Sequence, residues 1–324
     1  MLLSCFLTLS CLVAQISAKN PAPAKTAATV ALPPALQAQL QSSVGRAMAG
    51  RSGAAVVIEV NSGEIVAQYH LDVAARRLAR PGSAIKPFTL LAMLESGTIS
   101  ADSRLLCRRS VRVGAHHLDC THPEVPAPFD AIEAVAYSCN YWFTQNAARL
   151  SGPALRDALL QAGLASLTGA ASNEASGQVQ EATTLEQRQL QAIGEYGVQV
   201  TPLELLWAYR GLAQKRNAGQ SDGPLASVFA GLEASTRYGM AQCANVSGAA
   251  VAGKTGTAMA DEGSWTHGWF AGYAPAHHPE IALVVFLERG RGPVDAATIA
   301  AQVFSTYALT RAGTIRTEPM RPNP

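Results

Sequence analysis

Apolar and polar positions along the chain predict strands at both of its ends. Near the N-terminal end, two runs rich in β-branched residues, 54–60 and 65–70, flank the polar turn 61–64. That arrangement is typical of a β-hairpin. In the C-terminal third, three apolar runs have the length of strands, at 249–258, 269–273 and 281–288. A helical pattern over 295–309 follows the last of these runs.

Helical spacing fills most of the chain outside these strands. Three helical stretches are predicted, at about 34–49, 83–97 and 130–150, the last broken near 138–140. Thr201-Pro202-Leu203-Glu204 forms a capping box with proline at the first helical position and predicts a further helix start. The polar segment 165–182 is expected to be a loop. Strands at both ends with helices between them predict an α+β domain whose terminal segments share one sheet.

Composition supports a folded domain and argues against a nucleic-acid partner. The chain has 324 residues, of which 48% are hydrophobic and 15% charged. Such a chain can bury a large core and is not of the disordered class. The formal net charge is only +2, and no basic cluster with stacking aromatics is visible, so no nucleic acid is expected to bind.

The N-terminal segment has the pattern of an export signal. Residues 1–18 are mostly apolar, carry no charged side chain and end in Ile16-Ser17-Ala18, a small-residue ending typical of a signal-peptidase site. A retained membrane anchor, or lipid attachment at Cys5 or Cys11, stays open as an alternative. The protein is therefore expected to be exported, to the periplasm or another extracytoplasmic compartment. The expected organisation is signal peptide or anchor, Pro/Ala-rich linker, catalytic domain and flexible tail, at 1–18, 19–34, 35–312 and 313–324.

Four cysteines follow the apolar segment. Cys107 and Cys120 flank a short segment that can form a small hairpin, and export permits disulfides, so we predict that these two are paired. Two free buried thiols are the alternative. Metal binding with His116 and His117 is not expected, because the spacing matches no zinc pattern. Neither a metal nor an organic cofactor is therefore predicted.

Three short motifs carry the candidate chemistry. They are Ser83-Ala84-Ile85-Lys86, Ser138-Cys139-Asn140 and Lys254-Thr255-Gly256-Thr257. Each alone is a weak signal, but this order of a Ser-x-x-Lys, a Ser-x-Asn and a Lys-Thr-Gly motif is the set used by penicillin-binding proteins and related β-lactamases. Their settings also fit, since the first begins a predicted helix, the second falls in a helix break and the third lies on a predicted strand.

The residue types suit a serine acyl transfer. Ser83 and Lys86 lie three positions apart on one helix face, so the lysine can act as the base that a hydroxyl nucleophile needs. Ser138 can pass a proton to the leaving amine, and Asn140 can hold a substrate amide. Lys254 and Thr255 can bind a carboxylate, and Gly256 allows close backbone approach. The N–H groups of Ser83 and Thr257 can form an oxyanion hole.

At these residues the chain resembles the transpeptidase domain of the penicillin-binding proteins. The segments that carry the resemblance are PGSAIKPF, AYSCNYWF, VQVTPLELLWAYRGLA, GKTGTA, HGWFAGYAP and IALVVFLERG. The resemblance covers about 54–307 and implies an antiparallel sheet flanked by helices, with a helical subdomain between the N- and C-terminal strands. It also implies that Ser83 is acylated by the penultimate D-Ala of a peptidoglycan stem peptide, and that β-lactam antibiotics inhibit it covalently. Cell-wall synthesis proteins are a further class of partner, with none identified.

Several alternatives stay open. The same site would serve a D,D-carboxypeptidase or endopeptidase on stem peptides. A serine β-lactamase of class A needs an added glutamate, and neither Glu174 nor Glu181 has the required context. A penicillin-recognising sensor would acylate without turnover. Glu195 is expected in a surface turn, with contact to the cleft as the alternative. His267 is expected to pack or to line the cleft rather than to catalyse.

Overall fold

The computed structural model describes residues 31–317, and side chains as far as Gly313. The predicted signal peptide or anchor and most of the predicted linker lie outside the described residues. Within 31–317, no helix has both the length and the apolar character that a membrane span requires.

The predicted helices and strands occur in the predicted order, and the structure adds helices that were not predicted. The elements are α1 (Pro34–Met48), β1 (Gly53–Glu59), β2 (Ile65–Tyr69), α2 (Leu71–Arg76), η1 (Gly82–Ile85), α3 (Lys86–Glu95), β3 (Arg112–Val113), β4 (His116–His117), α4 (Ala131–Ala136), α5 (Asn140–Ala147), α6 (Gly152–Gln161), β5 (Gln178–Val179), α7 (Leu185–Gln191), β6 (Val198–Gln199), α8 (Pro202–Asn217), α9 (Pro224–Arg237), η2 (Gln242–Ala244), β7 (Ala252–Met259), β8 (Thr266–Ala274), β9 (Ile281–Leu287), η3 (Gly292–Ala296) and α10 (Ala297–Thr317). Among the helices that were not predicted are α2, α6, α7 and α9.

The main sheet joins the two ends of the described chain. Its strand order is β2-β1-β9-β8-β7, and every neighbouring pair is antiparallel. The N-terminal hairpin pairs with the last strand in a register that places Ala55 opposite Val285. The predicted α+β fold with a shared terminal sheet is therefore confirmed.

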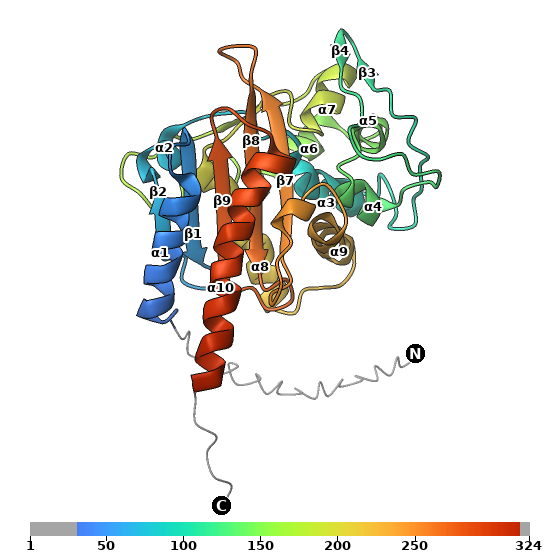
Figure 1. Ribbon diagram of the computed structural model, residues 1–324. Coiled ribbons are helices and arrows are strands. Elements are labelled where there is room, and N and C mark those ends of the chain that lie inside the picture. The colour runs from blue at the N-terminus through green and yellow to red at the C-terminus, as the bar shows by residue number, and fades with distance from the viewer. Residues whose placement is uncertain (1–30, 318–324) are drawn as a thin grey trace, which may run out of the picture. The chain divides into compact units, whose positions relative to one another are not determined.

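The sheet is buried on both faces, which explains why its strands are continuous apolar runs. Successive side chains of a strand point to opposite faces. In β1, Ala55 and Val57 join the core formed with α1 and α10, whereas Val56 and Ile58 join the core under the remaining helices. Figure 1 shows α1 and α10 side by side across one face of the sheet, with α3, α4 and α9 toward the β7 edge.

The predicted elements themselves differ from the structure in three details. The expected loop 165–182 contains β5, which pairs with β6 in a two-residue ladder too short to leave a periodic signal. The closing helix α10 continues to Thr317, past the predicted start of the tail at 313. The helix predicted after Pro81-Gly82 begins with the 3-10 turn η1 before it becomes α3.

Candidate active site

The segment that carries Ser83 is fixed from two sides. The hydroxyl of Tyr209 on α8 donates to the carbonyl of Ala84 at 2.7 Å. The indole N–H of Trp269 on β8 donates to the carbonyl of Arg80 at 3.0 Å. These bonds hold η1 against the sheet and leave Ser83 half-buried at the start of the helix that carries Lys86.

Two glycines allow η1 to approach β7 closely. A Cβ atom on Gly256 would overlap the carbonyl oxygen of Pro81, and one on Gly82 would lie 2.6 Å from the carbonyl oxygen of Thr257. Gly82 also has φ +52°, a conformation that other residues rarely adopt. This contact brings the backbone of Thr257 next to that of Ser83, as an oxyanion hole built from their N–H groups requires.

Gly256→Ala is expected to destabilise the domain and impair the site together. The added methyl group must push β7 away from η1, at a cost of about 2–4 kcal/mol. Gly211→Ala on α8 is the matched control, because nothing lies within 4 Å of its added Cβ; it should change stability by less than about 1 kcal/mol, toward higher stability. Thermal unfolding and penicillin labelling of both variants check this, and an unchanged Gly256→Ala variant would contradict the close approach.

Ser138 lies between the two motif lysines. Lys254 Nζ donates to Ser138 Oγ at 2.8 Å, and Lys86 Nζ lies 3.3 Å from the same oxygen. Lys86 Nζ also donates to the Ser138 carbonyl at 2.7 Å and to Asn140 Oδ1 at 2.6 Å. Ser138 has φ +54°, a left-handed conformation that ends α4 and turns its side chain toward the lysines. The three motifs therefore meet in one hydrogen-bonded network.

Burial favours the neutral form of both lysines. Desolvation lowers the pKa of Lys86 to about 8, although nearby cysteine and Glu195 charges oppose the shift. Desolvation, with the neighbouring charge of Lys86, holds the pKa of Lys254 well below its ordinary value. A lysine with a lowered pKa can accept a proton near neutral pH, which is the property a base for Ser83 needs.

A cleft of about 260 Å³ collects the predicted site residues that face solvent. Its lining includes Ser83, Ser138, Asn140, Thr255 and Thr257. The other three predicted residues, Lys86, Lys254 and Gly256, are buried beneath this surface. The two lysines contact the hydroxyl of Ser138, which lines the cleft. The cleft also contains Glu195, which agrees with the alternative that its turn contacts the cleft. His267 is buried beside Glu288 and Arg77, outside the cleft.

Comparison with known families agrees with this arrangement. A model of the penicillin binding protein transpeptidase domain matches residues 53–307. The chain belongs to the penicillin-binding protein transpeptidase family. The match spans β1 to α10 and so includes all three motifs.

Individual relatives of this transpeptidase-family chain support its fold. Pseudomonas aeruginosa PBP2, solved in complex with WCK 5153, superposes with a TM-score of 0.75 at 22% identity, over 87% of this chain and 80% of that one. The D,D-transpeptidase domain of a peptidoglycan glycosyltransferase from Eggerthella lenta gives 0.73 at 20% identity, over 84% and 81%. The peptidoglycan D,D-transpeptidase MrdA of Acinetobacter baumannii is 40% identical over 86 residues, a match that takes in 22% of this chain but only 12% of that protein.

Cys139, the middle residue of the second motif, lies in a cluster with Cys107, Cys120 and His122. Sγ of Cys120 lies 3.7 Å from Sγ of Cys107 and 3.8 Å from Sγ of Cys139. Nε2 of His122 lies 3.5 Å from Sγ of Cys107. The predicted Cys107–Cys120 disulfide is not formed in the structure. The two residues are neighbours, but both are free thiols, and the Cys139 thiol lies in the same cluster. The two histidines considered as metal ligands from the sequence, His116 and His117, are exposed on β4 and do not belong to this cluster.

The four residues suit a tetrahedral zinc ion. Zn–S and Zn–N bonds of about 2.3 and 2.0 Å at tetrahedral angles put ligand atoms about 3.5–3.8 Å apart. The three separations above fall in this range, and all four ligand atoms lie within 4.8 Å of one another. Nδ1 of His122 lies 2.7 Å from the Pro123 carbonyl; because a carbonyl only accepts, Nδ1 must carry the proton, and Nε2 is free to bind a metal. Each sulfur also accepts a backbone N–H at 3.3–3.4 Å, from Arg109 to Cys107, Tyr141 to Cys120 and Trp142 to Cys139.

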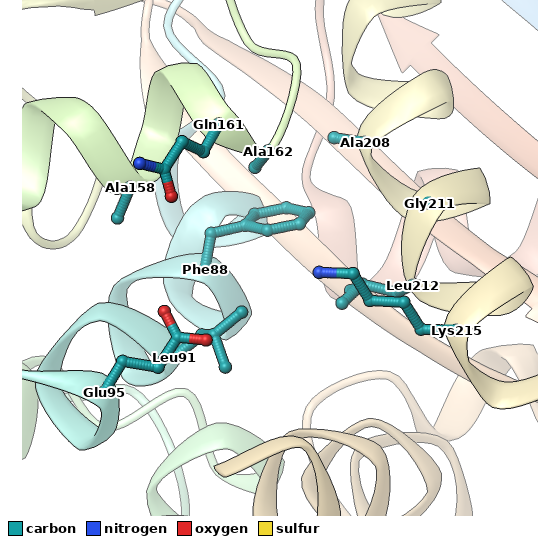
Figure 2. A pocket seen from close by; sticks show the side chains of 10 residues that line it. All are labelled: Phe88, Leu91, Glu95, Ala158, Gln161, Ala162, Ala208, Gly211, Leu212 and Lys215. Carbon is teal, nitrogen blue, oxygen red and sulfur yellow. The ribbon is translucent and has the colours of Figure 1, made fainter. Parts of the chain in front are cut away.

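A second cavity lies between α3, α6 and α8, away from these motifs. It has a volume of about 130 Å³, and Figure 2 shows the Phe88 ring and the amine end of Lys215 projecting into it. It contains none of the predicted site residues. The predicted site residues that face solvent line the cleft at η1 and β7 instead.

Proposed function

We propose that the protein is a peptidoglycan D,D-transpeptidase that works through an acyl-enzyme on Ser83. The observation that carries the proposal is the network in which Ser138 Oγ lies between Lys86 and Lys254 in the cleft that also contains Ser83. Its proposed substrates are stem peptides ending in D-Ala-D-Ala, and β-lactams are proposed as covalent inhibitors. The proposed place of action is outside the cytoplasm.

Acylation would begin with removal of the Ser83 proton. Lys86 in its neutral form is the base we assign, since burial lowers its pKa. The freed Oγ attacks the carbonyl carbon of the penultimate D-Ala. The resulting oxyanion is stabilised by the N–H groups of Ser83 and Thr257, preorganised by the contact between η1 and β7. Thr255 and Lys254 would bind the terminal carboxylate of the substrate.

Departure of the terminal D-Ala needs a proton on its amine. Ser138 Oγ can supply it, because Lys86, which has taken the Ser83 proton, lies 3.3 Å from that oxygen and can reprotonate it. A second stem-peptide amine then attacks the Ser83 ester, and the proton flow reverses. The product is a new peptide bond, and Ser83 is regenerated.

Exchange of the terminal D-Ala for a labelled D-amino acid tests this function. The purified protein should incorporate the label into a D-Ala-D-Ala peptide, and Ser83→Ala should not. Incorporation by both proteins, or by neither at high enzyme concentration, would count against a transpeptidase.

We also propose that Cys107, Cys120, His122 and Cys139 bind one Zn²⁺ with a structural role. Four protein ligands leave no open position for a catalytic water. The ion would fix Cys139, which lies between Ser138 and Asn140, and thereby support the residues that hold Lys86.

A further inference from the structure

Glu195 lies next to the nucleophile although it is distant in sequence. It belongs to the turn Gly194-Glu195-Tyr196-Gly197 that follows α7. A Cβ atom on Gly194 would overlap the backbone of Gly82, so this turn packs directly against the residue before Ser83. Glu195 and Ser83 line the same cleft, and only 16% of the Glu195 side chain is exposed.

The carboxylate of Glu195 has unused hydrogen-bonding capacity. Its contact with Arg80 is loose, at 3.6 Å, because the same guanidinium donates to Met259 and pairs with Asp261 at 2.7 Å. Among the described residues, none donates a hydrogen bond to the Glu195 carboxylate. An ionised carboxylate has about four acceptor positions, so Glu195 can accept from a water molecule in the cleft.

Glu204 provides an internal comparison. It is also buried, but its carboxylate accepts N–H groups of Gly177 and Thr201, each at 2.7 Å, as part of the α8 cap. That carboxylate therefore has a structural role. Within residues 31–317, Glu195 has no such bonds, and it lines the cleft that contains Ser83.

We propose that Glu195 is the general base that hydrolyses the Ser83 acyl-enzyme, which gives this site a D,D-carboxypeptidase branch beside transpeptidation. The inference rests on the proposed acyl-enzyme. It adds water to the stem-peptide amine as a second acceptor of the acyl group.

The step balances without any co-reactant except water. Ionised Glu195 takes one proton from a water molecule, whose oxygen forms a bond to the acyl carbonyl carbon. The oxyanion is stabilised by the N–H groups of Ser83 and Thr257. The bond between that carbon and Ser83 Oγ then breaks, and Oγ takes the proton back. A peptide carboxylic acid and free Ser83 result.

The charges that face Glu195 set its working pH. Desolvation raises the pKa of Glu195 to about 7; the positive charges of Arg80 and Lys86 oppose the rise, and Asp261 adds to it. Below pH 7 the carboxyl is protonated and cannot accept a proton. Hydrolysis of the acyl-enzyme should therefore rise with pH up to about 7 and level off above it.

Glu195→Gln separates hydrolysis from acylation, because it keeps the shape and removes the base. The exposed Glu64→Gln, in the β1–β2 turn, is the matched control. Fluorescent penicillin labels the full chain, and adduct formation and decay are then measured between pH 5.5 and 8.5, with D-Ala release from a diacylated Lys-D-Ala-D-Ala peptide. General-base catalysis contributes about 10²–10⁴-fold, so adduct decay and D-Ala release should slow by about 100-fold or more in Glu195→Gln. Its labelling rate should stay within about threefold, and the pH dependence of decay should disappear.

Other outcomes overturn specific claims. Equal decay rates and equal pH profiles in the wild type and Glu195→Gln would refute the assignment of Glu195, as would an equal loss of labelling and decay. Absence of any Ser83 adduct in the wild type would refute the proposed function itself.

Discussion

Ser83→Ala should abolish covalent labelling by penicillin, with at least a thousandfold loss of adduct. The variant lacks the oxygen that forms the ester, and the remaining cleft can bind the drug only reversibly. The fold should persist, because the Ser83 hydroxyl accepts or donates no hydrogen bond among the described side chains and the change costs less than about 0.5 kcal/mol. Gel fluorescence after labelling and a melting curve of each protein give the measurement.

A serine outside the cleft provides the control. Ser305→Ala, on α10, should label like the wild type. Persistent labelling of Ser83→Ala at the wild-type rate would show that a different residue is the nucleophile.

Removal of the proposed Zn²⁺ is the second change with a large expected effect. The purified protein should contain about one zinc ion per chain, and a strong chelator should lower its melting temperature by on the order of 10 °C. Penicillin labelling should slow at the same time, because the ion would fix Cys139 between Ser138 and Asn140. Elemental analysis, thermal unfolding and labelling kinetics measure these three effects.

Cysteine variants distinguish the zinc centre from the predicted disulfide. Cys120→Ala should lose the metal, whereas the exposed Cys243→Ala should keep it. After denaturation with chelator but without reductant, a thiol reagent should modify both Cys107 and Cys120. Protection of those two residues, in a protein free of zinc, would support the disulfide and overturn the metal centre.

The sheet and the three motifs could be predicted because their signals are local. The β-branched runs of β1 and β2, and the capping box at Thr201, are each visible within a few residues. The spacing of Ser83 and Lys86 likewise follows from one helix. The order of the three motifs along the chain, which resembles that of the penicillin-binding proteins, then indicated that Lys254 belongs to the same site.

Other functional features depend on contacts that no local pattern carries. Glu195 enters the cleft only because Gly194 packs against Gly82, a contact between segments more than 100 residues apart. The cysteine cluster combines residues from the β3–β4 region with Cys139, and the spacing of these ligands fits no compact zinc motif. His122 was missed for the same reason, because the sequence shows only that it lies two residues after Cys120.

The acyl-enzyme itself offers the most direct test of the account. The protein would be mixed with a peptide ending in D-Ala-D-Ala, quenched in acid within seconds and analysed by mass spectrometry of its proteolytic fragments. We expect a fragment containing Ser83 that is heavier by the mass of the peptide minus the mass of the released D-Ala, with the adduct absent from Ser83→Ala. No peptide adduct on the wild type, or an adduct on another residue, would contradict Ser83 acyl transfer as the function of this domain.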